Sequence, residues 1–330
     1  MEIQKVMIIG AGTMGHALAQ TFAQGGLWVY CVDTDEGILR KALGLIRASL
    51  ATLENQGIIS EGVSKAAFEK IRTFVGFDQV PRDPDLIIEA IYEDEHAKKE
   101  LFAKIDQLFP LETIIASNTS YLNVFELAKL RRPERFIITH WFTPPHIIPV
   151  VEVVRGPQTS SDTVRQIMSL LEKLGKKPIL VERYLPGFIV NRLQRVIGKE
   201  IFSLIDNGII SPQDLDTAVK YSLGIRIPVV GVVQRYDYAG LDFSLMTQKN
   251  EFISKEFNET PSKTLGDLVR AGHLGVKSGK GFYDYGGKAQ EEILRNRDIR
   301  LLKVKDLIDQ FDVTQVLHNE EDRSIKNKNP

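Results

Sequence analysis

The chain has little cysteine and no long apolar run. Its single thiol, Cys31, cannot form an internal disulfide or a multi-thiolate metal site. Cys31 lies in the apolar run of residues 27–32, which predicts a buried and inert side chain. No apolar run approaches the roughly 20 residues of a membrane span, and no basic segment precedes the first apolar residues as in a signal peptide. These absences predict a cytoplasmic protein without a membrane segment.

The chain also lacks an excess of charge of either sign. Its 42 Lys and Arg residues nearly balance its 43 Asp and Glu residues, which leaves a net charge of −1. This balance removes the usual electrostatic argument for nucleic acid or an anionic membrane as a partner. The 330 residues exceed what one hydrophobic core usually supports, so two domains are expected.

The first half alternates β-branched runs with helical stretches, which predicts an α/β fold with a doubly wound parallel sheet covered on both faces. Two helical segments, residues 36–56 and 63–72, flank a turn at Gly57 and predict a helical hairpin inserted after the second strand. The predicted strands are residues 6–9, 28–32, 86–90, 113–116, 135–139, 150–154 and 177–181.

After residue 186 the strand patterns nearly vanish, so the rest of the chain is expected to be mainly helical. Ser211 followed by Pro212 is typical of a helix N-cap and first helical position. Residues 318–330 have many charges and few apolar side chains, which predicts disorder. The predicted helices are residues 188–207, 243–257 and 263–271, and a charged extension over residues 289–312.

A glycine-rich loop connects the first predicted strand to an amphipathic stretch over residues 13–24. In such a loop one glycine permits a tight turn, one lets the backbone approach a pyrophosphate, and one lets the helix pack on the strand. The phosphates then meet the free N–H groups and the positive end of the helix. This context predicts a dinucleotide site in a Rossmann-type domain. The loop consists of Gly10, Ala11, Gly12, Thr13, Met14 and Gly15.

An acidic residue in the right place indicates which dinucleotide is bound. Asp33 ends the second predicted strand, 18 residues after Gly15, where a carboxylate would bind the ribose diol. Asp35 adds negative charge nearby, and residues 33–37 include no arginine to hold a 2′-phosphate. We therefore expect NAD rather than NADP, bound by a domain of residues 1–185. Residues 186–288 would form an all-α domain, followed by the charged extension of residues 289–330.

One histidine and one glutamate are placed for alcohol oxidation. His140 follows the predicted strand 135–139, at the edge where ligands of doubly wound sheets gather. Glu152 lies within the apolar strand 150–154, where an ionised carboxylate needs a partner. A histidine oriented by this carboxylate could remove a hydroxyl proton while hydride leaves to NAD. The alternatives are a structural role for His140 and a solvent-facing Glu152.

Small polar side chains offer further contacts. Residues 117–120, with the sequence Ser-Asn-Thr-Ser, follow a predicted strand and could donate to a substrate oxygen or the nicotinamide. Their alternative role is to cap a helix that begins near Leu122. Asn191 lies on the predicted helix 188–207, where its amide would face a cleft between the domains or fill a packing defect.

The neighbouring histidines have other expected roles. His146 is expected to be a loop or interface residue, whereas His16 and His96 are expected to be structural or solvated. None of them is a predicted metal ligand, and no metal is expected.

Together these segments resemble the 3-hydroxyacyl-CoA dehydrogenase family over about residues 3–286. The resemblance implies an oxidoreductase of fatty acid metabolism, with a Rossmann-type domain that carries a helical hairpin. It also implies an all-α domain through which such enzymes form homodimers, and an active site between the domains. The matching motifs are residues 117–120, 140–144, 151–153, 186–192 and 279–283.

The resemblance also implies roles for individual residues. His140 would be the general base and Glu152 its orienting partner. Ser120 and Asn191 would hold the substrate hydroxyl and the developing carbonyl. From the residues alone, Glu93 and Lys98 would be interpreted as helix-surface charges. The resemblance instead implies cofactor contacts for Glu93, Lys98 and Asn118, and a substrate contact for Thr143.

Some positions depart from the family pattern and leave the substrate open. Thr143 stands where the family usually has Asn, so a hydroxyl replaces an amide donor. Ser49 is retained, but residues 53–56 offer no lysine for coenzyme A. Residues 144–149 and 191–194 look more like relatives that oxidise L-carnitine or L-gulonate. The first expectation is an L-3-hydroxyacyl-CoA substrate and the second is a free 3-hydroxy acid; the third is a non-catalytic NAD-binding protein, like the related lens crystallin.

Overall fold

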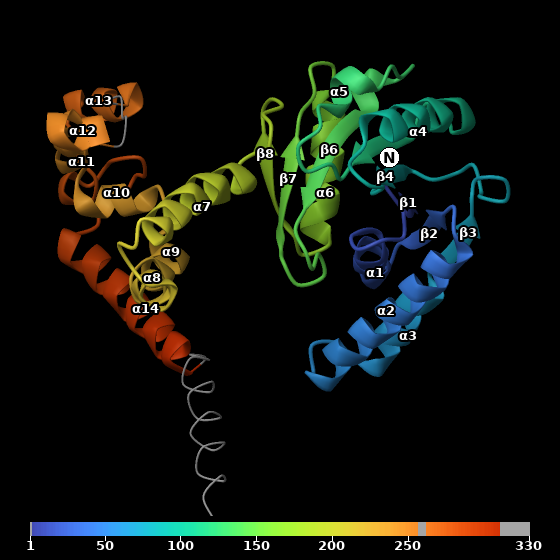
Figure 1. Cartoon of the computed structure of the whole chain (residues 1–330), viewed down its shortest axis with the longest axis horizontal. Helices are drawn as coiled ribbons and strands as arrows, with labels where there is room; N and C mark the ends of the chain where they lie inside the picture. Colours follow the sequence, from blue (N-terminus) through green and yellow to red (C-terminus); the bar gives the residue numbers. More distant parts are fainter. Residues whose placement is uncertain (1, 257–261, 311–330) are drawn as a thin grey trace, which may run out of the picture. The chain divides into compact units, whose positions relative to one another are not determined.

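The computed structural model describes residues 2–256 and 262–310 of the chain (Figure 1). Two compact units are present, Met1–Gly198 and Lys199–Pro330. The predicted disorder of residues 318–330 falls outside the described residues. Within the described part of the chain, no helix has the length and hydropathy needed to span a membrane.

The first unit contains one eight-stranded sheet with the order β3-β2-β1-β4-β5-β6-β7-β8. All neighbouring strands run parallel except β6 and β7, which are antiparallel. The doubly wound α/β fold is confirmed, but the expectation of a wholly parallel sheet was wrong. Residues 142–149, which join β6 to β7, form no helix, and a parallel pair would need a longer crossover. The strands are β1 (Lys5–Ile9), β2 (Trp28–Asp33), β3 (Ile71–Val75), β4 (Leu86–Glu89), β5 (Ile114–Ser117), β6 (Phe136–Trp141), β7 (Val150–Val154) and β8 (Lys177–Val181).

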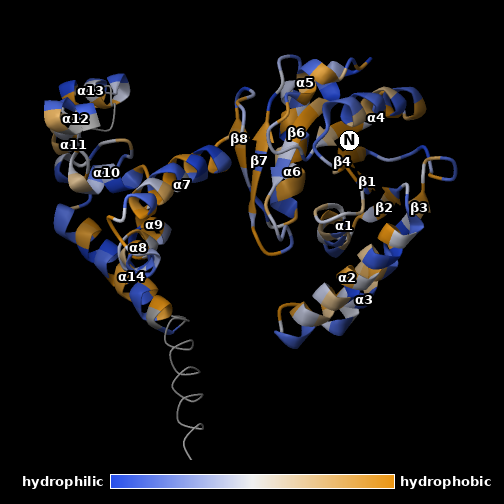
Figure 2. Cartoon of the chain, in the orientation of Figure 1, coloured by the Kyte–Doolittle hydropathy of each residue, from blue (hydrophilic) through white to orange (hydrophobic). Residues whose placement is uncertain are grey.

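The central strands are apolar because helices cover both faces of the sheet, as Figure 2 shows by the orange colour of the strands. On one face they pack against α1 (Gly15–Gln24), α2 (Glu36–Asn55) and α6 (Ser161–Lys173). On the other face they pack against α4 (Glu95–Leu108) and the short α5 (Val124–Leu127). Because β1, β4 and β5 run parallel, their carboxyl ends lie at the same edge of the sheet, and loops follow each of them there.

The predicted helical hairpin is present as α2 and α3 (Glu61–Glu69), with Gly57 in the left-handed region at φ 67°. The second helix was predicted to continue to residue 72, but it ends at Glu69. Ile71 begins β3, which pairs in parallel with β2 at the edge of the sheet. This pairing is a long-range interaction, and it outweighs the local helical pattern at the end of the segment.

The thiol of Cys31 in β2 is 1% exposed, and burial, reinforced by the negative charge of Asp33, raises its pKa to about 12. The prediction of a buried thiol is confirmed. A thiol with so high a pKa forms little thiolate at neutral pH, so it is a poor nucleophile.

The described part of the second unit contains helices and no named strand, as predicted. Ser211 caps a helix, since its Oγ accepts a hydrogen bond of 3.0 Å from Asp214 N. The expectation of one continuous helix over residues 243–257 was wrong, because the extended backbone of Asn250 separates two helices there. Helix α7 (Val190–Asp206) begins in the first unit and ends in the second. The helices that follow it are α8 (Pro212–Tyr221), α9 (Leu223–Val230), α10 (Gln234–Ala239), α11 (Leu241–Lys249), α12 (Glu251–Glu256), α13 (Lys263–Arg270) and α14 (Gln290–Gln310).

Candidate active site

The glycine loop lies between β1 and α1, at the carboxyl edge of the sheet. Gly10 has φ 95°, and a Cβ there would lie 2.6 Å from the carbonyl oxygen of Ala90. A Cβ on Gly15 would lie 1.6 Å from the carbonyl oxygen of Gly10. Only glycine therefore fits at this position in the first turn of α1. Around Gly12, by contrast, nothing lies within 4 Å of the Cβ position. The loop therefore presents open backbone at the start of a helix, which fits a dinucleotide pyrophosphate.

Asp33 holds the glycine loop from the end of β2. Its Oδ2 accepts a hydrogen bond of 2.8 Å from Ala11 N, and its Oδ1 accepts one of 3.2 Å from Asp35 N. The side chain of Asp33 is half-buried at this edge of the sheet. Asp35 has a different role, because its Oδ1 caps α2 by accepting from Gly37 N and Ile38 N.

His140 and Glu152 are brought together by the antiparallel pairing of β6 and β7. The register places them directly opposite each other, and His140 Nδ1 lies 2.7 Å from Glu152 Oε2. His140 is the fifth of six residues in β6, whereas the sequence placed it after the strand. Glu152 has an exposed fraction of 0%, so it does not face solvent.

The surroundings of Glu152 keep its carboxylate ionised. Its Oε1 accepts hydrogen bonds of 2.9 Å from Ile189 N and Val190 N, at the start of α7. Burial opposes ionisation, but these donors and His140 outweigh it and hold the pKa of Glu152 below its ordinary value. The ionised carboxylate can accept a hydrogen bond from the Nδ1–H of His140, which leaves the lone pair of the imidazole on Nε2.

Two aromatic rings enclose the imidazole of His140. The ring centroids of Phe142 and Phe188 lie 4.7 and 5.2 Å from that of His140. Phe188 has a φ of 49°, which non-glycine residues adopt rarely. Its turn directs the next two backbone N–H groups toward Glu152. Asn191 follows directly, half-buried in the first turn of α7.

A second buried charge cluster lies under the loop after β5. Lys98 on α4 is 1% exposed, and its Nζ lies 2.5 Å from Glu89 Oε1 and 3.2 Å from Glu93 Oε2. Ser117 Oγ donates to Glu89 Oε2 at 2.6 Å. The interpretation of Lys98 and Glu93 as helix-surface charges was wrong, because Lys98 is buried and Glu93 precedes α4.

Through Glu93 this cluster positions the loop of residues 117–120. Glu93 accepts from Thr119 Oγ1 at 2.8 Å and also from the backbone N–H of Ser120. Thr119 Oγ1 in turn accepts from Leu122 N at 2.9 Å, so the turn that precedes α5 is held by Thr119 and not by Ser120. Asn118 Oδ1 accepts from Trp141 N at 3.0 Å, which ties the loop to β6.

Glu89, which was not predicted from the sequence, is also a member of this site. The signal was available, since Glu89 ends the apolar run of residues 86–89 much as Glu152 interrupts residues 150–154. Both carboxylates lie in buried strands and both require a partner. For Glu152 a histidine was a candidate partner, whereas Lys98 lay in a segment that looked solvent-exposed.

Thr143 lies on the loop that follows β6 and reaches the glycine loop. Its side chain is exposed, and its Oγ1 lies 3.0 Å from Met14 Sδ as a hydrogen-bond donor. The residue predicted to contact substrate thus lies beside a residue predicted to contact the cofactor.

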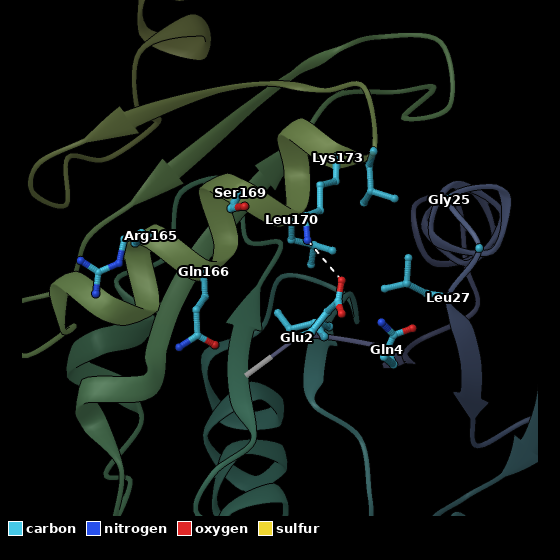
Figure 3. A pocket seen from close by; sticks show the side chains of 12 residues that line it. Glu2, Gln4, Gly25, Leu27, Arg165, Gln166, Ser169, Leu170 and Lys173 are labelled. Carbon is cyan, nitrogen blue, oxygen red and sulfur yellow. Dashed lines mark hydrogen bonds and ion pairs between the residues drawn. The ribbon is translucent and has the colours of Figure 1, made fainter.

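A cavity of about 400 Å³ lies at the opposite edge of the sheet (Figure 3). Its lining includes Gln4 and Leu27, which precede β1 and β2, and Gly25 at the end of α1. An ion pair of 3.2 Å between Lys173 and Glu2 lies at its rim. Because ligands of doubly wound sheets bind at the carboxyl edge, this cavity is not part of the site described above.

Models of known protein families match nearly the whole described chain. The family model described as "3-hydroxyacyl-CoA dehydrogenase, NAD binding domain" matches residues 5–184. The model described as "3-hydroxyacyl-CoA dehydrogenase, C-terminal domain" matches residues 187–285.

Individual relatives differ in their substrates. The chain is 32% identical over 310 residues to 5-formyl-3-hydroxy-2-methylpyridine 4-carboxylate 5-dehydrogenase of Mesorhizobium japonicum, with 93% of this chain and 99% of the relative covered. It is 35% identical over 289 residues to a probable 3-hydroxybutyryl-CoA dehydrogenase of Bacillus subtilis, with 86% and 98% covered. A solved 3-hydroxyacyl-CoA dehydrogenase of Archaeoglobus fulgidus superimposes with a TM-score of 0.75 at 30% identity, with 92% of this chain and 99% of that chain covered.

Proposed function

This chain belongs to the 3-hydroxyacyl-CoA dehydrogenase family, and on that premise we propose that it oxidises the 3-hydroxyl of an L-3-hydroxyacyl-CoA to the 3-ketoacyl-CoA. It is an oxidoreductase that acts on CH–OH groups and uses NAD as its cofactor. The observation that carries the proposal is the 2.7 Å contact between His140 Nδ1 and the buried carboxylate of Glu152. This pair forms a general base at the edge of the sheet where the dinucleotide loop also lies.

The base works through the free nitrogen of the imidazole. His140 Nε2 accepts the proton of the substrate hydroxyl, and the ionised Glu152 stabilises the imidazolium that results. When bound, NAD supplies the acceptor for the hydride that leaves C3. Ser120 and Asn191 hold the oxygen as it changes from hydroxyl to carbonyl. Phe142 and Phe188 limit the access of water to the imidazole.

The proposed cofactor contacts follow the loop geometry. Asp33 binds the ribose, while Asn118 and Glu93 lie toward the nicotinamide. Lys98 acts through Glu93 and not by direct contact, because its ammonium group is buried against two carboxylates. The pyrophosphate is held by the loop of Gly10, Gly12, Thr13, Met14 and Gly15.

A free hydroxy acid is the second candidate substrate. Residues 53–56 supply no lysine for coenzyme A, and the Mesorhizobium japonicum relative, which is named for a carboxylate substrate, aligns with 93% of this chain. Thr143 also departs from the asparagine usual in CoA-dependent members, and we propose that it contacts the substrate directly.

Initial rates on a substrate panel test these proposals. We expect NADH oxidation with acetoacetyl-CoA, and the comparison substrates are L-carnitine and L-gulonate with NAD. Turnover of the free acids alone would overturn the CoA proposal. An absence of turnover on the whole panel, with NADH still bound by fluorescence titration, would instead indicate a non-catalytic NAD-binding protein.

The assembly is a further proposal from family membership. We propose a cytoplasmic homodimer formed through residues 186–288, with residues 1–185 as the cofactor domain and residues 289–330 as an extension. Light scattering on the full chain should give twice the mass of one chain; the mass of one chain would contradict the dimer.

A further inference from the structure

One tyrosine joins two segments that carry proposed catalytic residues. Tyr184 lies in the segment of residues 182–189, between β8 and α7, and its side chain is half-buried. Its hydroxyl donates a hydrogen bond of 2.6 Å to the carbonyl oxygen of Tyr121, which directly follows Ser120. Among the described residues, no other hydrogen bond connects this segment with residues 117–122. The Tyr184 hydroxyl is thus the polar link between the two.

The ring of Tyr184 packs on the turn that surrounds the proposed base. It contacts the ring of Phe188 edge to face, at a centroid distance of 6.2 Å and an interplanar angle of 83°. The Phe188 ring in turn lies 5.2 Å from that of His140, and the two residues after Phe188 donate their backbone N–H groups to Glu152. Tyr184 therefore contacts this turn through its ring and the loop of Ser120 through its hydroxyl.

The backbone around Ser120 is held from two directions. The N–H of Ser120 donates to the side chain of Glu93, which precedes α4. The peptide group between Tyr121 and Leu122 is bound at both ends, since its N–H donates to a threonine hydroxyl of the same turn at 2.9 Å and its carbonyl oxygen accepts from Tyr184. The bond from Tyr184 is therefore the one that ties the backbone after Ser120 to the segment before α7.

The phenol of Tyr184 is a donor throughout the neutral pH range. Burial, and then the negative charges of Glu126 and Glu93, raise the pKa of Tyr184 above its ordinary value of 10.0. The hydroxyl is therefore protonated at neutral pH, and its partner is a backbone carbonyl that does not titrate. The link consequently stays the same over the pH range in which a histidine gains and loses its proton.

From these contacts we infer that Tyr184 is a positioning residue, which fixes the Ser120 hydroxyl relative to the imidazole of His140. The inference rests on the proposed function, in which Ser120 holds the substrate oxygen and His140 takes up its proton. Both side chains must meet one hydroxyl group, although they come from different segments. A displacement of about 1 Å in such an arrangement can lower a rate about 10²-fold. By its bond to Tyr121, Tyr184 restrains the loop against this displacement.

Tyr184→Phe tests this role, because it removes the hydroxyl and keeps the ring that packs on Phe188. We expect kcat on the best substrate of the panel to fall about 10-fold, and not further, since Glu93 still holds the loop from the other side. The KM of the substrate and the Kd for NADH should stay within about twofold of those of the parent protein, because Tyr184 is not among the proposed substrate or cofactor contacts.

Tyr30→Phe is the matched control. The hydroxyl of Tyr30 in β2 donates to Asp83 Oδ1 at 3.3 Å, so this variant also loses one tyrosine hydrogen bond, but away from the site. Its kcat should equal that of the parent protein, while the Tm of the two variants should fall by similar amounts. Equal kcat values for Tyr184→Phe and Tyr30→Phe would overturn the inference.

A double variant separates the positioning of Ser120 from a general effect on the site. Ser120→Ala has no hydroxyl left to position, so the addition of Tyr184→Phe should lower its kcat by less than about twofold. The pH profile of kcat/KM for Tyr184→Phe should keep the apparent pKa of the parent protein, because His140 and Glu152 are unchanged. A further 10-fold loss in Ser120→Ala, or a shifted pH profile, would show that Tyr184 acts through His140 instead, which contradicts the inference.

Amide hydrogen exchange tests the link independently of catalysis. If the parent protein turns over no substrate of the panel, the proposed function fails, and exchange is followed by mass spectrometry on the full chain with saturating NAD. Tyr184→Phe should speed exchange in residues 117–123 about 10-fold relative to the parent protein, whereas Tyr30→Phe should not change it there. Equal exchange of this loop in the two variants would overturn the role of Tyr184 whether or not the protein is active.

Discussion

Glu152 and Glu89 are two glutamates in similar positions with different consequences. Each lies in an apolar strand, each has an exposed fraction of 0%, and each accepts hydrogen bonds from both side-chain and backbone donors. The pKa of Glu152 is held below its ordinary value by His140 and two backbone donors, which outweigh burial. Burial raises the pKa of Glu89 in spite of the opposing charge of Lys98.

The partner decides what each buried glutamate can do. An imidazole gains and loses a proton near neutral pH, so a carboxylate beside it can support a base. The ammonium group of Lys98 instead forms a fixed ion pair with Glu93, and Glu93 in turn accepts a hydrogen bond from the backbone N–H of Ser120. Similar sequence environments thus give one pair suited to proton transfer and another suited to positioning.

Replacing His140 should have the largest effect on the first pair. His140→Gln keeps a polar side chain but removes the group that we propose takes up the proton. We expect kcat to fall about 10²–10⁴-fold, as for loss of a general base. The Kd for NADH, measured by fluorescence titration, should be unchanged. The exposed His96→Gln is the control, and a kcat for His140→Gln equal to that of the control would refute the role of base.

Replacing Lys98 should break the second pair and act on stability. Lys98→Met leaves two carboxylates without their cation, and we expect the free energy of unfolding to fall by about 3–5 kcal/mol. Urea titration followed by circular dichroism measures the change. The double variant Lys98→Met, Glu89→Gln also removes one of the two carboxylates and should recover part of the loss. Equal stability of Lys98→Met and the parent protein would show that the pair contributes nothing.

The pH dependence of stability tests whether the pKa of Glu152 is lowered, in contrast to the raised pKa of Glu89. Because its folded pKa is lowered, the stability contributed by ionised Glu152 is present above the ordinary value of 4.5 and is lost as pH falls through the folded value. The stability difference between the parent protein and Glu152→Gln should therefore narrow as pH falls below about 4.5. Thermal unfolding from pH 5 to pH 3 measures this difference. A difference that widens as pH falls over this range would contradict the lowered pKa of Glu152.

Much of the fold could be predicted because its patterns are local. The apolar strands, the glycine loop after β1 and the cap at Ser211 each depend on neighbouring residues only. The edge strand β3 was missed because its pairing with β2 is a long-range interaction. The break at Asn250 was missed because apolar residues lie on both sides of it, at 243–246 and 252–253.

The candidate site was predictable in part for the same reason. A glutamate within an apolar run predicts a buried partner, and this reasoning led to Glu152 and His140. It did not lead to Lys98, because a charged segment looks solvent-exposed until α4 packs on the sheet. It also did not indicate that Tyr184 would lie beside Tyr121, 63 residues away in the chain.

The sequence by itself determined the class of fold and the dinucleotide loop, because strand periodicity and glycine spacing express local geometry. Only the tertiary structure decided which charges are paired. The antiparallel register placed His140 opposite Glu152, and the packing of α4 buried Lys98 against Glu89. The strength of an ion pair depends on the distance between the charged groups and on their burial, and both are determined only when segments far apart in the sequence pack together.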